Sequence, residues 1–375
     1  MIYLDYSANT PVDARVLEQF CAVERRCIGN ANSHHQAGSA AKAEIDAATI
    51  KIASLLGVQP AEIIYTSGAS EANNFALKGL ARLSRHAGRH IISTPLEHSS
   101  VSGTLTALQE QGYEIDLLDV KQDGTVDLEH LKDLLRPDTI CVAITLVDSE
   151  LGVVQPVQEI AAILKAYPHC HLHVDATQAV GKIPVSFEGV DTMSLTAHKF
   201  YGLNGIGLLI KRRNLALEPL IHGGESTTIY RSGTPTVALA SSLACALDLA
   251  VIDLPNRVDH VAKLNAELRA ALSTYPLVHI NSPEHAIPHV LNLSVRNVKG
   301  TVFQRELDAK GVCVSVKSAC SSDGLPSRAV FAVSRDRRNA LSSWRISLSH
   351  LTTEEEIRAF LQAFDVCYRE LTAAH

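Results

Sequence analysis

Short apolar runs rich in β-branched residues alternate along the chain with segments whose apolar residues recur every three or four positions. The short runs predict strands at residues 62–66, 90–94, 113–120, 139–147, 172–174, 193–196 and 206–211. The longer segments predict helices at residues 70–84, 127–135 and 157–167, and another from about residue 99. This alternation indicates βαβ units. It predicts an α/β fold with a mostly parallel sheet between layers of helices and the strand carboxyl ends at one edge.

The pattern changes after about residue 237. A long helical segment runs to residue 254, and Pro255 is expected to end it before a second long helix over about 258–275. Short strands at 290–295, 313–316 and 344–348 precede a closing helix from about residue 353. We therefore expect a large α/β domain over residues 13–254 and a smaller α+β domain built from residues 1–12 and 255–375.

Composition narrows the class of protein. The 375 residues are 46% apolar and carry a net charge of −6 without a long basic run, which argues against a nucleic-acid-binding surface. No apolar run reaches the roughly 18 residues of a membrane-spanning helix, and no signal-peptide pattern is visible, so no membrane association is expected. Eight cysteines occur without a Cys-x-x-Cys pair, which favours reduced thiols and a cytoplasmic location.

Three polar clusters follow predicted strands, where ligands bind in open α/β sheets. Residues 66–74 (TSGASEANN) join a strand to a helix, and backbone N–H groups with the Ser70 hydroxyl would suit a phosphate; an ordinary turn capped by Ser70 is the alternative. Asp175 ends another strand and could instead be a structural carboxylate. Lys199 follows the strand at 193–196, where a surface lysine is the alternative reading.

Taken together, the clusters are more specific than each one alone. Pyridoxal 5'-phosphate (PLP) requires an amine for a Schiff base, an anion beside its pyridine nitrogen and a cradle for its phosphate. Lys199 and Asp175 end two predicted strands 24 residues apart, so one crossover can place them on either side of one ring. The sequence therefore predicts a PLP site.

The motifs resemble those of the cysteine desulfurases of the class V aminotransferase type, in the group with a long mobile cysteine loop. The resemblance begins at residues 3–13 (YLDYSANTPVD) and continues through 343–347 (SWRIS) and 351–357 (LTTEEEI), so it covers essentially the whole chain. It implies the PLP-dependent transferase fold type I.

The resemblance also implies roles for individual residues. Lys199 would bind PLP covalently and later move protons, Asp175 would face the ring nitrogen, and His98 would stack on the ring and assist proton transfer. Gln178 would donate a hydrogen bond to the phenolic oxygen. Thr234 would reach the cofactor of the other subunit, which implies a homodimer. The remaining implied cofactor-binding residues are Ala69, Ser70, Ser149, Thr196 and His198.

Two further residues would act on the substrate. Arg345 would bind the substrate carboxylate, for which a planar guanidinium is well suited. Cys320 lies among small residues, a glycine and a proline, which predict a flexible loop, and the nearby Lys317 would favour its thiolate. The implied reaction converts L-cysteine to L-alanine and passes sulfur, as a persulfide on Cys320, to an acceptor protein, for example in iron–sulfur cluster assembly. The other seven cysteines are expected to be mostly inert core thiols.

Three departures from the family pattern concern rate and substrate preference. Ser149 stands where asparagine is common, residues 225–230 replace a glycine-containing run before Arg231, and Lys317 replaces a glycine. A selenocysteine lyase or another PLP β-lyase remains an alternative within the family. A scaffold without turnover is a further alternative, which retention of the whole residue set disfavours.

A remote alternative is a metal-binding protein. His169, His171 and His173 alternate along one stretch, so on a strand they would share a face.

Overall fold

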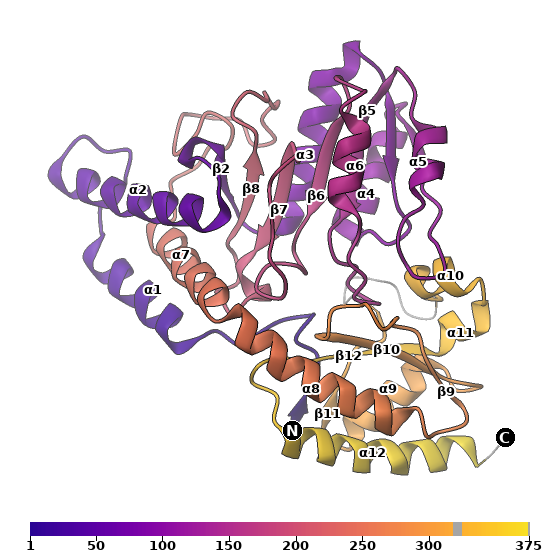
Figure 1. Cartoon of the computed structure of the whole chain (residues 1–375). Coiled ribbons are helices and arrows are strands. Elements are labelled where there is room, and N and C mark those ends of the chain that lie inside the picture. The colour runs from indigo at the N-terminus through magenta and orange to yellow at the C-terminus, as the bar shows by residue number, and fades with distance from the viewer. Residues whose placement is uncertain (318–324, 374–375) are drawn as a thin grey trace.

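The computed structural model describes residues 1–317 and 325–373. Its larger part is built on a seven-stranded sheet in the order β2-β8-β7-β6-β5-β3-β4 (Figure 1). The strands are β2 (Ile63–Thr66), β3 (His90–Ser93), β4 (Glu114–Leu117), β5 (Thr139–Thr145), β6 (His171–Asp175), β7 (Thr192–Thr196) and β8 (Gly207–Lys211). Strand β8 runs antiparallel to β2 and β7, while β7, β6, β5, β3 and β4 pair in parallel. The predicted mostly parallel sheet is confirmed.

Helices cover both faces of this sheet because successive strand residues point to opposite sides. Ile91 packs with α3 (Ala69–Leu83) and α4 (Ser99–Gln109), whereas Ile92 belongs to the core on the other face. The helices contributing to that second core are α2 (Gln36–Leu56), α5 (Leu128–Leu134), α6 (Val157–Leu164) and α7 (Val237–Ile252). Helix α1 (Ala14–Arg26) packs against α7. Strands and helices thus form the three layers expected of an α/β fold.

The smaller part contains a three-stranded antiparallel sheet in the order β12-β10-β9. Its strands are β9 (Val278–Ile280), β10 (Val290–Val295) and β12 (Ser343–Ser347), and its helices are α8 (Leu254–Leu272), α9 (Gly300–Ala309), α10 (Arg328–Ser334), α11 (Arg337–Ser342) and α12 (Glu354–Thr372). Trp344 stacks on Phe303 with ring centroids 5.1 Å apart at the centre of its core. Strand β1 (Ile2–Tyr3) pairs with β11 (Val312–Cys313), and Leu4 is buried in the same core. The N-terminal segment therefore packs with this smaller part.

The junction of α7 and α8 separates the two cores, since α7 packs in the first and α8 in the second. The two helix axes differ by 65°. This bend supports the domain boundary that we propose near residue 254. One boundary expectation was wrong: Pro255 lies in the first turn of α8, where its missing N–H costs no hydrogen bond, so the helix begins at Leu254 rather than at 258.

Among the described residues, no single helix is long and apolar enough to cross a membrane. Helices α7 and α8 would together have the required length and apolar composition, but they are bent by 65° relative to each other.

Candidate active site

A cavity of about 350 Å³ lies at the carboxyl ends of β5, β6 and β7, within the size range usual for small-ligand sites. Ten of the twelve residues singled out in the sequence line it. They are Ala69, Ser70, His98, Ser149, Asp175, Gln178, Thr196, His198, Lys199 and Arg345. The structure therefore brings together residues from six separate stretches of sequence.

Asp175 and Lys199 reach this cavity from neighbouring parallel strands. Asp175 is the last residue of β6 and pairs in register with Ser194 of β7, and Lys199 ends the short turn of helix that follows β7. The Nζ atom of Lys199 donates hydrogen bonds to the carbonyl oxygens of Ser7 and Ala8, at 2.7 and 2.6 Å. One crossover thus places the amine and the carboxylate on one cavity, as predicted.

The connection from β2 to α3 forms one wall. Gly68 precedes the helix at φ 154°, and its backbone packs so closely on Gly207 that a Cβ on Gly207 would lie 2.7 Å from the Gly68 Cα. The first N–H groups of a 15-residue helix lack partners within that helix, so Ala69 and Ser70 offer donors for an anion. Ser70 lies inside the helix, with Gly68 at the N-cap position, so the alternative that Ser70 caps the turn is wrong.

Thr196 and His198 complete this wall. The Thr196 hydroxyl lies 3.1 Å from His198 Nδ1. Burial, with smaller effects of the Lys199 and Lys182 charges, lowers the pKa of His198 to about 4. His198 is therefore a neutral hydrogen-bonding group at neutral pH, and it adds no positive charge beside Lys199.

Arg345 of β12 enters the cavity from the smaller part and is 1% exposed. Its Nη2 donates to the Asp5 carboxylate at 2.9 Å, and its Nη1 donates to the Ser149 carbonyl at 2.7 Å. The ion pair of Arg345 is therefore a buried one rather than one at the surface. Asp5 and Ser149 fix the plane of the guanidinium beside the cavity, where it can receive a carboxylate.

His98 and Gln178 both line the cavity, and each has defined hydrogen-bond partners. His98 occupies the N-cap of α4, where its Nδ1 accepts from the Ser100 backbone N–H at 3.2 Å. Burial lowers the pKa of His98, while Asp175 acts in the opposite direction. Gln178 donates to the Ser7 carbonyl at 2.9 Å, and its Oε1 accepts from Lys182 at 3.0 Å.

The cavity suits PLP on observations of its own. The Ser7 hydroxyl, the Thr177 hydroxyl and the Arg345 Nε are buried and have no hydrogen-bond partner within the described part of the chain, and all three residues line the cavity. Such buried polar atoms are costly unless a ligand completes them. The helix start at Ala69 and Ser70 would hold a phosphate, and Asp175 would hold a protonated ring nitrogen.

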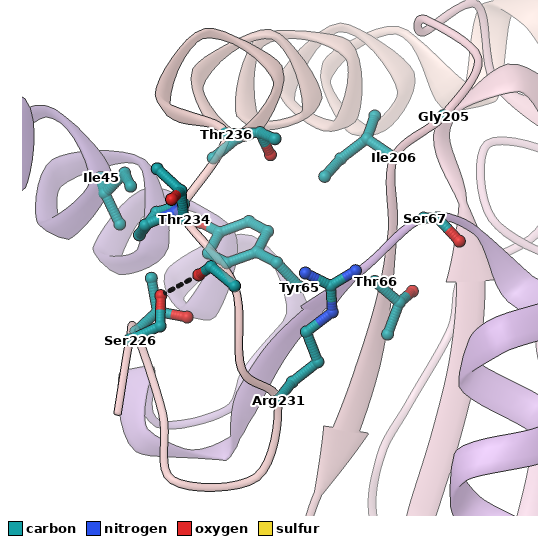
Figure 2. A pocket seen from close by; sticks show the side chains of 14 residues that line it. Ile45, Tyr65, Thr66, Ser67, Gly205, Ile206, Ser226, Arg231, Thr234 and Thr236 are labelled. Carbon is teal, nitrogen blue, oxygen red and sulfur yellow. Dashed lines mark hydrogen bonds between the residues drawn. The ribbon is translucent and has the colours of Figure 1, made fainter. Parts of the chain in front are cut away.

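Thr234 does not line this cavity. It lines a separate pocket of about 180 Å³ with Tyr65 and Thr236, in a segment where the Ser226 hydroxyl donates to the Gly233 carbonyl (Figure 2). Ser67 lines both pockets, so the two share a wall.

An ion pair joins the Thr234 segment to the wall of the cavity. Arg231 Nε donates to Glu71 of α3 at 2.9 Å. Although burial raises the pKa of Glu71, hydrogen bonds from Arg231 and Ser67 outweigh it and lower that pKa. The role of Thr234 toward a second subunit stays a prediction, and Cys320 lies outside the described residues.

The histidine string does not form a metal site. Strand β6 begins at His171, so His169 lies outside it. His173 bonds to Asn73 and Thr192, whereas His171 lies 3.8 Å from Asp191. Within residues 1–317 and 325–373, no group of three or more histidine, cysteine, aspartate or glutamate side chains could hold a metal ion.

Four partners of the predicted residues were missed. Asp5 and Ser7 lie more than 160 positions from the residues they contact, and nothing in their own sequence context indicates those contacts. Asn73 lies in the 66–74 motif. Lys182 follows Gln178 by four positions, and that short spacing is the one local signal that could have found Lys182.

Comparisons with known proteins agree with this site. The family description "Aminotransferase class-V" matches residues 2–360. The chain is 40% identical over 365 residues to "Cysteine desulfurase IscS" of Proteus mirabilis, which covers 95% of this chain and 90% of that protein.

Two solved structures are also similar. The one titled "NIFS-LIKE PROTEIN" has a TM-score of 0.92 at 36% identity and covers 99% of each chain. The one titled "SspA in complex with cysteine" has a TM-score of 0.83 at 30% identity and covers 94% of this chain and all of that chain (100%). The chain therefore belongs to the class-V aminotransferase family, which is PLP-dependent and in which matching relatives are named cysteine desulfurases.

Proposed function

We propose that this protein is a PLP-dependent cysteine desulfurase that converts L-cysteine to L-alanine and passes the sulfur, as a persulfide on Cys320, to an acceptor protein. One observation carries the proposal: Lys199, Asp175, His98 and Arg345 converge on one cavity. An amine, an anion, an imidazole and a carboxylate receptor are the groups that PLP chemistry on an amino acid requires.

The position of each residue in the cavity indicates its role in the reaction. Arg345 binds the substrate carboxylate with a guanidinium already oriented by Asp5 and Ser149. When bound, PLP supplies an electron sink at the substrate α-carbon, and Asp175 keeps its ring nitrogen protonated. Lys199 would hold the cofactor, and its Nζ would accept the α-proton of the substrate. His98 is placed to carry a second proton.

Sulfur transfer is assigned to Cys320. Its thiolate bonds to the substrate sulfur, the substrate carbon–sulfur bond breaks, and the electron pair of that bond stays on carbon, which a proton completes to alanine. Cys170 and Cys367 are poor nucleophiles, because burial raises the pKa of Cys170 to about 12 and that of Cys367 to about 11. Of the seven described cysteines, Cys141, Cys170 and Cys367 are buried and four are half-buried, so the expectation of mostly core thiols was too broad.

The test is product formation from cysteine by the PLP-loaded protein with a thiol reductant. We expect alanine and sulfide in equal amounts, and we expect Cys320→Ala to lose both while keeping the absorption of lysine-bound PLP. Cys313→Ala, a change at a half-buried cysteine close in sequence, is the matched control and should retain activity. Full sulfide release by Cys320→Ala would contradict the assignment of Cys320.

The second candidate is a selenocysteine lyase on the same scaffold, which the departure at Ser149 favours. The Ser149 backbone carbonyl accepts from Arg345, as the carbonyl of any residue there could, so the departure lies in the side chain: a hydroxyl where the family commonly has an asparagine amide. The ratio of kcat/KM for cysteine and selenocysteine decides between the two activities. We expect turnover of both substrates, and activity confined to selenocysteine would favour the second candidate.

We also propose a homodimer in the cytoplasm. Thr234 lies outside the cavity of its own chain, and Ile28, Ile50 and Ile229 are exposed by 87, 59 and 65%. A second copy covering these side chains would bring Thr234 toward a neighbouring cofactor. Light scattering after size exclusion should give twice the 40.5 kDa chain mass, and Ile229→Asp should lower it. A reduced compartment suits a thiol that must cycle through a persulfide.

A further inference from the structure

Asn73 is a hub of hydrogen bonds beneath the cavity. It lies in the second turn of α3 with no exposed surface. Its Nδ2 lies 2.8 Å from Asp175 Oδ2 and 2.9 Å from the Ser100 hydroxyl. Its Oδ1 lies 3.0 Å from His173 Nε2 and also accepts from the Ser194 hydroxyl. All four hydrogen-bonding positions of one amide are thus used.

The partners fix which end of the amide faces Asp175. The other carboxylate oxygen of Asp175 accepts from the Thr177 backbone N–H at 2.9 Å. The opposite amide orientation would direct a carbonyl oxygen at an ionised carboxylate and leave its charge without this donor. Asn73 therefore donates to Asp175 and, together with the Thr177 N–H, fixes the orientation of this carboxylate.

The orientation of Asn73 also determines the state of His173. Because Oδ1 of Asn73 is an acceptor, His173 must carry its proton on Nε2. Its Nδ1 then accepts from the Thr192 hydroxyl at 2.9 Å. Burial lowers the pKa of His173 to about 4, which agrees with a neutral ring at neutral pH. His173 thus holds the amide in place as a donor.

The same directionality continues to His98. Because the Ser100 hydroxyl accepts from Asn73, its own proton is available to His98 Nδ1, 2.9 Å away. The Ser100 backbone N–H also points to Nδ1, at 3.2 Å. Two donors at one nitrogen make Nδ1 an acceptor, so the proton of neutral His98 resides on Nε2.

We propose that Asn73 is a positioning residue whose single amide orients the Asp175 carboxylate and, through Ser100, fixes the Nε2-protonated tautomer of His98. The relevance of this proposal to catalysis rests on the proposed function. In that reaction Asp175 and His98 assist proton transfer, and both are positioned by Asn73, whose side chain does not line the cavity. His98 therefore starts each cycle as a neutral donor through Nε2.

Other charged groups around His98 also act on its titration. Asp175 of β6 raises its pKa, whereas Lys199 and Arg328 of α10 lower it. Arg328 is itself held by the Glu97 carbonyl at 3.3 Å and the Ser102 hydroxyl at 3.2 Å. Of these groups, Asp175 accepts directly from Asn73, so a change at Asn73 also acts through Asp175. Ser100→Ala leaves that hydrogen bond in place and isolates the contribution of the Ser100 hydroxyl to His98.

The test is a pH titration of the imidazole nitrogens by long-range ¹H–¹⁵N NMR on the cofactor-free protein. His98→Gln identifies the signal among the 17 histidines. Wild-type His98 should be the Nε2-protonated tautomer at pH 7.5. Asn73→Asp should raise the pKa of His98 by about one unit or more, because the Ser100 hydroxyl then donates to the new carboxylate and presents a lone pair to Nδ1.

Asn74→Asp is the matched control, since it makes the same change one position along the helix, where the amide bonds only to the Ser70 carbonyl. Ser100→Ala tests the chain if Asn73→Asp does not fold: it should raise the pKa of His98 by a smaller amount, and Ser100→Thr should restore it. The proposal would be overturned if wild-type His98 carried its proton on Nδ1. It would also be overturned if the pKa of His98 in both Asn73→Asp and Ser100→Ala equalled its pKa in Asn74→Asp. Alanine formation from cysteine is measured in a separate assay. A failure of the proposed function would therefore appear there, and a failure of this proposal would appear in the NMR titration.

Discussion

Replacing Lys182 with methionine should change the pH dependence of stability in a direction set by its surroundings. Lys182 is 5% exposed, and its Nζ donates to Gln178 Oε1. Burial, followed by the positive charges of Lys199 and Arg345, lowers its pKa from 10.5 to about 7. The folded protein therefore holds this amine largely without its proton over a pH range in which the unfolded chain keeps it.

The sign of the effect follows from proton linkage. Between the folded pKa near 7 and the unfolded value of 10.5, the unfolded state binds more protons, so a rise in pH stabilises the folded state. Raising the pH from 7 to 9 should increase the free energy of unfolding of the wild type by about 2 kcal/mol relative to Lys182→Met. The methionine variant lacks this titration and should show no such gain.

The assay is equilibrium urea unfolding of the cofactor-free protein at pH 7, 8 and 9. Circular dichroism reports the whole chain, and fluorescence of Trp344, the single tryptophan, reports the core of the smaller part. Lys165→Met, a change at an exposed lysine, is the control and should leave the wild-type pH dependence intact. A wild-type-minus-Lys182→Met difference that is constant from pH 7 to 9 would refute the reasoning.

Two further predictions concern the supports of the site. Asp5→Ala should destabilise the protein by about 3–5 kcal/mol and raise the KM for cysteine, because the buried Arg345 guanidinium loses its counter-charge. Asp46→Ala, which removes the exposed Lys42–Asp46 ion pair, should cost less than about 1 kcal/mol. Denaturant unfolding checks both, and equal losses would count against the role of Asp5. Gly207→Ala should lower PLP affinity about tenfold or more, because the added Cβ would lie 2.6 Å from the Leu195 carbonyl oxygen and force the β2–α3 connection outward. Gly103→Ala, where nothing lies within 4 Å, should bind PLP like the wild type in a fluorescence titration, and unchanged affinity in Gly207→Ala would disprove the steric argument.

Much of the fold could be predicted because the local pattern and the tertiary packing agree. The segment of β10 (VLNLSV) alternates apolar and polar residues from Leu291 to Val295, and its predicted bounds of 290–295 match those observed. The helix at α8 was predicted to start late because Pro255 was read as a break, although a proline in the first turn is tolerated. Sequence pattern alone does not distinguish these two uses of proline.

The site was predictable to the extent that its side chains follow strands. Asp175 ends β6, and Lys199 follows the adjacent parallel strand β7 within three residues, so topology brings them together. The contacts that set their states were not predictable, because they join distant positions: 340 residues separate Asp5 from Arg345, and 102 separate Asn73 from Asp175. Such contacts become visible only once the chain has folded.

Borohydride reduction of the PLP-loaded protein, followed by peptide mass spectrometry, tests the central claim most directly. Two lysines lie near the cavity: the half-buried Lys199 lines it, whereas the buried Lys182 does not and instead bonds to Gln178. We predict one phosphopyridoxyl group per chain on the peptide containing Lys199, and none in Lys199→Ala. Modification of Lys182 in the wild type, or a wild-type protein that takes up no PLP, would contradict the account.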